Sequence, residues 1–369
     1  MLSYESAGYV IILPAVCLFG IAGNILNLVV LIKDKIQGTA YSYLKALAIL
    51  DLLSLAFILP IITRCSTCIL RDSHFGPFFE AYIHVFIGDV FIKSSIWTVV
   101  VFTAERCITS CFPTSALSLL VQKRIWGGAT VGVRGSLGNQ RQSAVTNVLL
   151  IVLVLAIENS PTFWKYEIQN NVVVRGADFE QNVFFRFYDW FDALFSCLIP
   201  SLTLIILNII LITFLRKRGE NAQTSESTAA TQTSGLHPHS YVPGNTGPAV
   251  VRRSRGEQTR ILVTLVGIVI LSLSTILPTF IIQLIGQYST FAACNFFNLR
   301  VTNSILLAVN CSGNFVLYCM LNRRFWASFK KVFGLYNCSH PQHTTRIIVT
   351  RILPIQQPAL PPSTASSAP

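Results

Sequence analysis

The chain has 369 residues, of which 52% are hydrophobic and only 12% are charged. A soluble domain typically has about 45–50% apolar and about 25% charged residues. The composition therefore excludes a soluble enzyme of ordinary composition, and it also excludes an intrinsically disordered protein, which needs low hydrophobicity. The net charge of +12 is interpreted as a signal for membrane orientation, and nucleic acid is not expected as a partner.

Hydropathy predicts a polytopic membrane protein. A helix needs about 20 mostly apolar residues to cross the hydrocarbon core of a bilayer. Seven stretches meet this requirement, and they are Tyr9–Ile32, Ser42–Ile62, Phe78–Ala104, Ala144–Phe163, Phe187–Leu215, Ile261–Ile285 and Val301–Leu321. The predicted fold class is an all-α membrane protein, a seven-transmembrane helix bundle within residues 1–333. Residues 334–369 are rich in Pro, Ser and Ala and are predicted to form a disordered tail.

The positions of Lys and Arg predict the orientation of the bundle. Most basic residues follow the first, third, fifth and seventh spans, and the positive-inside rule places these segments in the cytoplasm. The N-terminus is then extracellular and the C-terminus cytoplasmic, as expected for a multi-pass protein of the plasma membrane. The opposite face has more acidic than basic residues, which favours a cationic ligand.

Polar side chains recur at one depth in several spans. Asp51 lies midway along the second span, where an ionisable residue costs about 2.5–3.5 kcal/mol on insertion scales, so it should face the bundle interior. Asn24, Ser95, Asn310 and Asn314 lie at matching depth in other spans. One interpretation is a pocket for a small hard cation such as Na⁺, and the other is a hydrogen-bonded packing cluster that satisfies Asp51.

Two further charged pairs occur in the third span. Asp89 and Lys93 are four residues apart and therefore share one helix face. They form either a self-neutralising pair or the floor of a cavity that is open to the outside, where they meet the charge of a ligand. Glu105 and Arg106 close the same span, and taken alone they indicate an ordinary interfacial pair.

In combination, these residues resemble the rhodopsin-like family of G-protein-coupled receptors. The motifs are Gly23-Asn24, Leu-Ala-x-x-Asp ending at Asp51, Glu105-Arg106-Cys107, the span prolines Pro161, Pro200 and Pro278, and Asn310-x-x-x-Asn314-Phe315-x-x-Tyr318. Most members have proline where this chain has Phe315. That variant is similar to the invertebrate FMRFamide-type neuropeptide receptors.

The resemblance implies roles for these residues. Glu105 would hold Arg106 at rest and release it to engage a heterotrimeric G protein, and Tyr318 would swing inward on activation. No cofactor is expected apart from a structural Na⁺ in a pocket formed by Asn24, Asp51, Ser95, Asn310 and Asn314. Residues 323–333 would form a short amphipathic eighth helix on the lipid bilayer, and arrestin would be a further cytoplasmic partner.

The resemblance also implies an extracellular ligand, a short amidated, FMRFamide-like neuropeptide. Depth and analogy give the candidate ligand contacts, which are Tyr82, Asp89, Lys93, Phe187, Trp190, Gln283 and Gln287. For the aromatic residues, anchoring at the membrane interface is the alternative. Other function classes stay open: a chemoreceptor for small odorants, a signalling-impaired receptor, or a transporter or channel with Asp51, Asp89 and Lys93 along its path.

An enzyme is not expected, because the sequence has no nucleophile–base pair, phosphate-binding glycine loop or metal-ligand spacing. Two departures from the family pattern stand out. Ala81 replaces the usual cysteine at the start of the third span, and residues 165–186 contain no cysteine, so Cys65, Cys68 and Cys294 are the candidate replacements for that disulfide. The glycine-rich segment 125–140 is either a true linker or an error of the gene model.

Overall fold

The computed structural model describes residues 7–33, 38–60, 75–111, 133–169, 172–176, 182–232, 247–288 and 293–334. The chain divides into two units after Gly334, and every described element belongs to the first. The predicted tail beyond Gly334 lies outside the described residues. So do Cys65, Cys68 and residues 125–132 of the glycine-rich segment.

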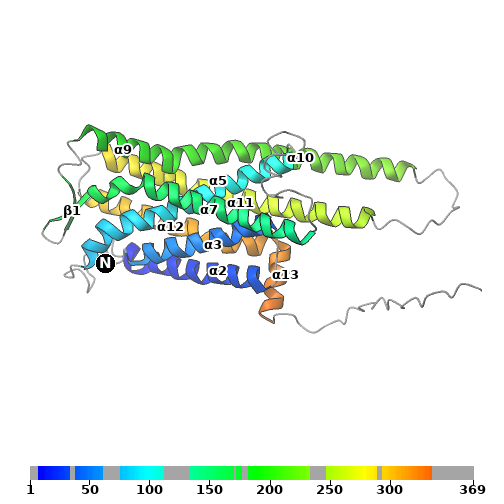
Figure 1. Ribbon diagram of the computed structural model, residues 1–369, viewed down its shortest axis with the longest axis horizontal. Coiled ribbons are helices and arrows are strands. Elements are labelled where there is room, and N and C mark those ends of the chain that lie inside the picture. The colour runs from blue at the N-terminus through cyan, green and yellow to red at the C-terminus, as the bar shows by residue number, and fades with distance from the viewer. Residues whose placement is uncertain are drawn as a thin grey trace, which may run out of the picture. The chain divides into compact units, whose positions relative to one another are not determined.

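Among the described residues, seven helical segments are of membrane-spanning length, and several of them contain a π-helical or 3₁₀ turn. Their bounds are η1 Gly8–Ile12 with α2 Leu13–Lys33; α3 Thr39–Ile58; α4 Phe75–Phe78, η3 Phe79–Gly88 and α5 Asp89–Cys111; α7 Val133–Glu158 with η4 Ser160–Trp164; α9 Val183–Ala193, η5 Leu194–Leu198 and α10 Ile199–Gln232; α11 Gly247–Tyr288; and α12 Ala293–Leu321. Each segment is long and apolar enough to cross a membrane. The predicted seven-helix bundle is confirmed (Figure 1).

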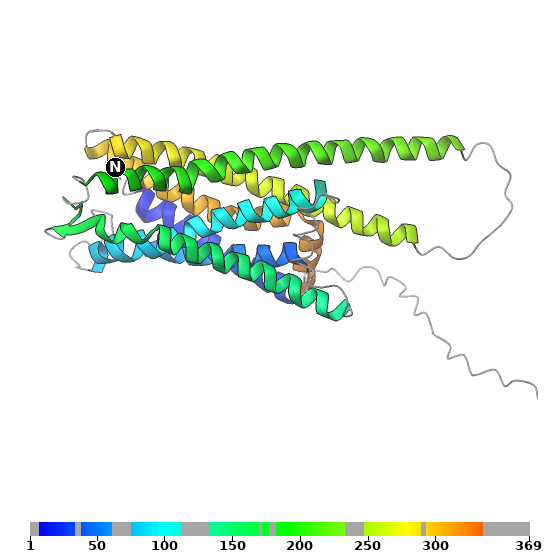
Figure 2. The ribbon, with the colours of Figure 1, turned by 45° about the horizontal axis from the view of Figure 1, so that its top comes forward.

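Helices that are distant in sequence pack side by side in the bundle. α12 packs against both α2 and α11, while α5 packs against α3, α7 and α10 (Figure 2). Gly20 of α2 allows the closest approach, because a Cβ atom at this position would lie only 2.1 Å from Ser312 Oγ of α12. Small residues allow such contacts between membrane helices, where van der Waals packing drives association.

The outer surface of the bundle is apolar. Along α10, the exposed residues Ile199, Leu202, Ile206 and Ile209 follow a helical spacing of three and four residues. A similar exposed stripe on α7 includes Leu149 and Leu153. Contiguous apolar stripes of this kind are a liability in water and are the normal lipid-facing surface of a membrane protein.

Two helices extend beyond the predicted spans. α10 has 34 residues and α11 has 42, and at 1.5 Å per residue even α10 is about 51 Å long, longer than the roughly 30 Å of a hydrocarbon core. The predicted ends at Leu215 and Ile261 therefore mark the ends of the apolar runs and not of the helices. Helix propagation adds one hydrogen bond per residue after nucleation, so an apolar helix can continue into polar sequence.

Continuation of the helix beyond the apolar run also places the start of α7 before the predicted start at Ala144. This helix begins at Val133, so part of the glycine-rich segment 125–140 is helical. Its two glycines at 135 and 138 weaken helix propensity by about 1 kcal/mol each, but they are followed by a long apolar stretch that supports the helix.

A short β-hairpin covers one end of the bundle and was not predicted. Strand β1, Tyr166–Gln169, pairs antiparallel with β2, Val172–Arg175, and Gln169 lies opposite Val172. The three consecutive valines of β2 and the two-residue connection are typical hairpin signals. We call this the hairpin end. It is the end at which the first described helical segment, η1 with α2, begins (Figure 1).

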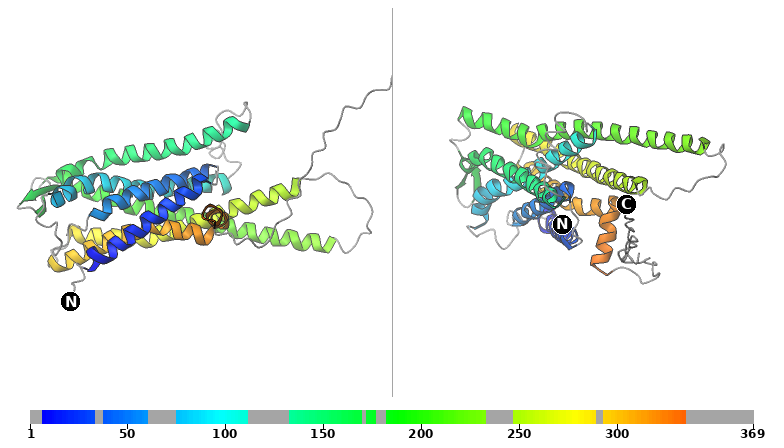
Figure 3. Two further views of the ribbon diagram at one scale, coloured as in Figure 1. Left: turned by 90° about the horizontal axis from the view of Figure 1, so that it is seen from below. Right: turned by 45° about the vertical axis from the view of Figure 1, so that its right-hand side comes forward.

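Helix α13, Arg323–Val332, lies at the opposite end and runs across the direction of the bundle (Figures 1 and 3). Its first turn is fixed by the side chain of Asn322, which accepts a hydrogen bond of 3.1 Å from the backbone N–H of Phe325. The buried ring of Phe325 packs against Tyr318 of α12, with ring centroids 5.8 Å apart. Lys330 and Lys331 occupy the last turn, where basic groups complement the helix dipole.

Substitution Asn322→Ala should loosen α13 without affecting the bundle. Loss of an N-cap costs about 1 kcal/mol, so amide hydrogen exchange within α13 should accelerate by roughly fivefold. Asn322→Asp is the control, since it keeps the accepting oxygen and should leave exchange near the wild-type rate. Equal exchange in the alanine and aspartate variants would contradict the capping role.

Candidate functional site

Asp51 of α3 lies at the centre of the bundle and is fully buried. The hydroxyl of Ser95 in α5 donates to Oδ1 at 2.6 Å, and Nδ2 of Asn314 in α12 donates to Oδ2 at 2.7 Å. Each carboxylate oxygen is thus held by a neutral donor from a different helix. Within the described part of the chain, no basic side chain forms an ion pair with Asp51.

The other members of the predicted pocket are buried nearby, with different partners. Asn24 of α2 donates through Nδ2 to the backbone oxygens of Gly20 at 3.0 Å and Cys311 at 2.9 Å, so it fastens α2 to α12. Asn310 is buried at 6% exposure. Ser95 and Asn314 therefore contact the carboxylate of Asp51 directly. Asn24 instead donates to the backbone of α2 and α12 and accepts a 3.5 Å hydrogen bond from Nδ2 of Asn27.

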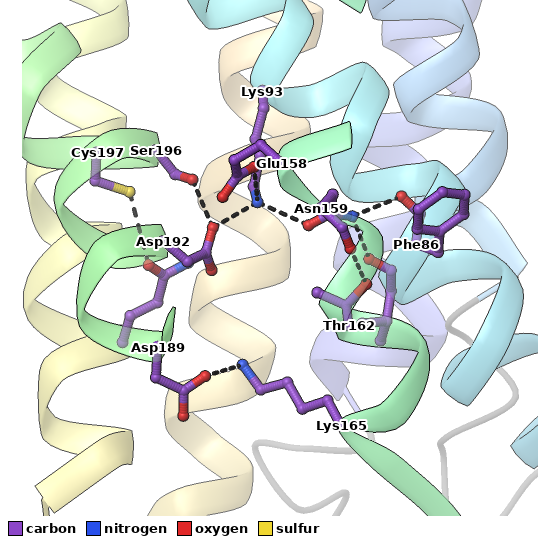
Figure 4. A network of polar contacts seen from close by, with 12 residues as sticks. Phe86, Lys93, Glu158, Asn159, Thr162, Lys165, Asp189, Asp192, Ser196 and Cys197 are labelled. Carbon is purple, nitrogen blue, oxygen red and sulfur yellow. Dashed lines mark hydrogen bonds and ion pairs between the residues drawn. The ribbon is translucent and has the colours of Figure 1, made fainter. Parts of the chain in front are cut away.

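A second buried polar group is a network around Lys93 that joins three helices (Figure 4). Nζ of Lys93 in α5 lies 2.5 Å from Oδ1 of Asp192 in α9 and 3.3 Å from Oε2 of Glu158 in α7. It also donates to Oδ1 of Asn159 at 2.8 Å. These three contacts use all three donors of the ammonium. The side chains of Lys93 and Glu158 are each only 7% exposed, so the contacts lie inside the protein. We call Lys93, Glu158, Asn159 and Asp192 the Lys93 network.

This network adds partners for Lys93 that were not predicted from the sequence. The prediction considered Asp89, one turn earlier in α5, either as the partner that neutralises Lys93 or as its neighbour at the floor of a cavity. Asp89 does interact electrostatically with Lys93, but Glu158 and Asp192 make the direct ion pairs. These two residues are 65 and 99 positions away in sequence. Nothing in the sequence indicated that they pair with Lys93, and they counted only among the acidic residues of one membrane face.

Hydrogen bonds extend the Lys93 network to neighbouring elements. Nδ2 of Asn159 donates to the backbone oxygens of Val85 and Phe86 at 3.1 and 2.8 Å, within the π-helical segment η3. Ser196 donates to Oδ1 of Asp192 at 2.8 Å. These bonds fix the carboxylate and the amide that face Lys93, so the network is preorganised.

Closer to the hairpin, a second buried lysine pairs with α9. Nζ of Lys165 lies 2.9 Å from Oδ1 of Asp189 (Figure 4). Burial opposes the charged form of Lys165, but Tyr166 and the carboxylates of Asp189 and Asp192 outweigh it and raise its pKa above the ordinary value. Lys165 is therefore protonated at neutral pH, and the ion pair ties the base of the hairpin to α9.

The remaining predicted ligand contacts have different surroundings. Gln283 of α11 accepts a 3.6 Å hydrogen bond from the thiol of Cys197 in η5, which places it beside the α9 segment. Tyr82 is half-buried in η3, with its ring 5.5 Å from that of Phe78. The side chain of Gln287 lies outside the described residues.

Phe187 and Trp190 do not face the bundle interior. They are 69% and 42% exposed, and Phe187 belongs to an outward apolar stripe of α9 with Phe184 and Phe191. Their exposure fits the alternative of anchoring at the membrane interface, and their role as ligand contacts stays a prediction. The orientation of α9 about its own axis explains why these two aromatic residues are exposed. The polar face of the helix, with Asp189 and the neighbouring Tyr188, is the face that packs inward.

At the α13 end of α5, Arg106 pairs with its neighbour. Nη2 of Arg106 donates to Oε1 of Glu105 at 2.5 Å, and Glu105 is largely buried. Tyr43 of α3 interacts with Glu105 and accepts a 2.8 Å hydrogen bond from Asn147 of α7. The hydroxyl of Tyr318 is also buried here, without a hydrogen-bond partner among the described residues.

The described cysteines do not form a disulfide. Those described with their side chains are free, namely Cys17, Cys107, Cys111, Cys197, Cys311 and Cys319. The side chain of Cys294 lies outside the described residues, as do Cys65 and Cys68. The proposed replacement disulfide therefore stays a prediction.

Comparison with known proteins supports a receptor. No family model matches the chain. It is 22% identical over 348 residues to a Caenorhabditis elegans protein named Probable G-protein coupled receptor B0563.6, a match that covers 90% of this chain and 70% of the relative. It is 25% identical over 222 residues to Probable G-protein coupled receptor AH9.1 of the same organism, covering 58% of this chain and 50% of that relative. Together with the seven helices that are long and apolar enough to cross a membrane, these similarities support a multi-pass membrane protein that resembles probable G-protein-coupled receptors, which are receptors and not enzymes.

Proposed function

We propose that the protein is a rhodopsin-like receptor of the plasma membrane that binds a short amidated, FMRFamide-like neuropeptide and activates a heterotrimeric G protein. The hairpin end faces the outside together with the N-terminus. The α13 end faces the cytoplasm, where the G protein and arrestin bind.

The observation that carries this proposal is the placement of three polar groups along α5. Lys93 in its buried network, Ser95 beside Asp51 and Arg106 at the α13 end all belong to this one helix. A small shift of α5 would therefore change the contacts of the Lys93 network, of Asp51 and of Arg106 together. Receptor activation requires such an element, with two arrangements that a ligand can bind with different affinity.

The charges at the hairpin end support a basic ligand. The described side chains of Lys93 and Lys165 interact with the carboxylates of Asp89, Glu158, Asp189 and Asp192. These four acids and two lysines together carry a formal charge of −2. An amidated peptide that contains arginine is positively charged and brings no C-terminal carboxylate, so it complements this charge.

Asp51 supports a role for sodium. Its carboxylate is buried, is held by the neutral donors Ser95 and Asn314, and forms no ion pair with a described basic residue. A buried charge without a counter-ion is costly. A Na⁺ ion, which prefers oxygen ligands, would neutralise Asp51 in the resting receptor.

Substitution Arg106→Ala tests the proposed function. In cells that express the receptor, FMRFamide-like peptides should activate G protein through the wild type. The Arg106→Ala variant should bind the peptides with little change and lose G-protein activation, because Arg106 lies at the end of α5 far from the Lys93 network. Radioligand binding and a G-protein dissociation assay measure the two properties separately.

The exposed Arg216 provides a matched control, since Arg216→Ala removes a basic residue elsewhere near the end of the fifth span. It should leave activation near the wild-type level. A peptide response that survives Arg106→Ala would contradict the coupling role. Ion currents without G-protein activation would instead favour a channel or transporter.

A further inference from the structure

The Lys93 network contains more acid than its lysine can neutralise. Glu158 and Asp192 both form ion pairs with the single ammonium of Lys93, and Asp89 interacts with it electrostatically. Charges removed from water interact strongly, and a buried carboxylate is retained only when it is well paired. The excess negative charge therefore gives this region a strong preference for a second cation.

Two buried oxygens without a described hydrogen-bond partner belong to this acidic region. Oε1 of Glu158 is buried and has no hydrogen-bond partner among the described residues, although its side chain is only 7% exposed. The hydroxyl of Tyr188 is likewise buried without a described partner, in a residue that is 6% exposed. Tyr188 interacts electrostatically with Glu158 and Asp192, so its hydroxyl belongs to this region.

Buried polar atoms nearly always have a hydrogen-bond partner, so two unpartnered oxygens in one acidic region indicate a missing donor. A guanidinium group carries five N–H donors in a planar fork, and it binds carboxylates through two parallel hydrogen bonds. It therefore has enough donors for both Oε1 of Glu158 and the oxygen of Tyr188, and its planar fork matches a carboxylate better than an ammonium does.

The network is more exposed at Asp192 than at its other charged members. The side chain of Asp192 is 23% exposed, compared with 7% for both Lys93 and Glu158. Asp192 lies in α9, one turn after Asp189, which holds Lys165 at the base of the hairpin. Asp192 is thus the most accessible charged member of the Lys93 network.

We propose that Glu158 and Asp192 form the anchor for the guanidinium group of the peptide ligand, and that Lys93 is the internal cation which neutralises this anchor when no ligand is bound. The inference rests on the proposed function, because it assigns a specific subsite to an arginine-containing peptide. Binding would exchange part of the Lys93 ion pairing for the ligand's guanidinium and would loosen the link between α5, α7 and α9.

A double-mutant cycle tests the anchor on the full-length receptor in lipid nanodiscs. The probes are FMRFamide and an analogue with citrulline in place of arginine, which keeps the shape and removes the charge. In the wild type, the citrulline peptide should bind roughly 30-fold more weakly, as expected for a desolvated charge pair. With Glu158→Gln, FMRFamide should lose a similar factor and the two peptides should bind almost equally.

Glu167→Gln is the matched control. Glu167 is an acid of the neighbouring hairpin strand β1 and is exposed, so its substitution should leave the 30-fold preference intact. Asp192→Asn provides a second variant with a more exposed carboxylate, in case Glu158→Gln fails to fold. It should also reduce the preference for arginine over citrulline.

Three outcomes would overturn the anchor: equal binding of both peptides to the wild type, an equal loss for both peptides in Glu158→Gln, or no binding of either peptide at millimolar concentration. Binding is measured without a G protein, so a failure of the anchor can be distinguished from a failure of G-protein activation. Normal arginine-dependent binding without G-protein activation would contradict the proposed function and leave the anchor standing.

Discussion

Substitution Lys93→Met should lower the free energy of unfolding by about 3–5 kcal/mol, the usual cost of removing one partner of a buried ion pair. The cost arises because Glu158 and Asp192 would remain in the protein interior without the ammonium that neutralises them. Methionine has a similar volume and stays apolar, so the change isolates the charge. The shift in thermal unfolding of the purified receptor measures the effect.

Two variants sharpen this experiment. Lys33→Met replaces an exposed lysine at the end of α2 and should change stability by less than about 0.5 kcal/mol. The triple variant Lys93→Met/Glu158→Gln/Asp192→Asn removes the charges together and should recover more than half of the lost stability. A small effect of Lys93→Met, or a triple variant no more stable than the single one, would refute the structural role of the network.

Substitution Asp51→Ala should destabilise the receptor by about 2–6 kcal/mol, because it leaves two buried donors unsatisfied at about 1–3 kcal/mol each. These donors are the hydroxyl of Ser95 and the amide of Asn314. Ser95→Ala, which removes only one donor, should cost clearly less. Thermal unfolding of the two variants in the same detergent or nanodisc gives the comparison.

Sodium dependence tests the proposed cation site directly. Replacement of K⁺ by Na⁺ at constant ionic strength should stabilise the wild type by about 1 kcal/mol when Na⁺ is present at roughly five times its dissociation constant. Asp51→Asn removes the negative charge and should abolish this difference. Identical unfolding in Na⁺ and K⁺ for the wild type would exclude a sodium site at Asp51, and the cluster would then be a packing contact alone.

The hydropathy of the sequence was sufficient to predict the seven membrane spans, because each apolar run is close to the length that a bilayer requires. It was insufficient for the ends of the helices, since α10, α11 and α7 continue into polar or glycine-rich sequence. Backbone hydrogen bonding maintains the helix there, and hydropathy does not report it. The hairpin at Tyr166–Arg175 was missed because its strands are only four residues long.

The Asp51 cluster was partly predictable. The depth of Asp51, Ser95 and Asn314 follows from counting residues along helices that rise 1.5 Å per residue, and the structure places these three in contact. The depth of a residue in the membrane does not, however, tell whether its side chain faces the bundle interior or the lipid. Phe187 lies at a suitable depth for a ligand contact, yet its side chain faces outward.

The sequence by itself determined that this protein is a bundle of seven membrane helices, with a buried carboxylate in the second helix and several charged residues in the third helix. Only the tertiary structure decided which charges meet: Lys93 pairs with Glu158 and Asp192 across α7 and α9. The physical reason is that composition and periodicity fix the length and depth of each helix, whereas its rotation and its neighbours are set by packing among all seven.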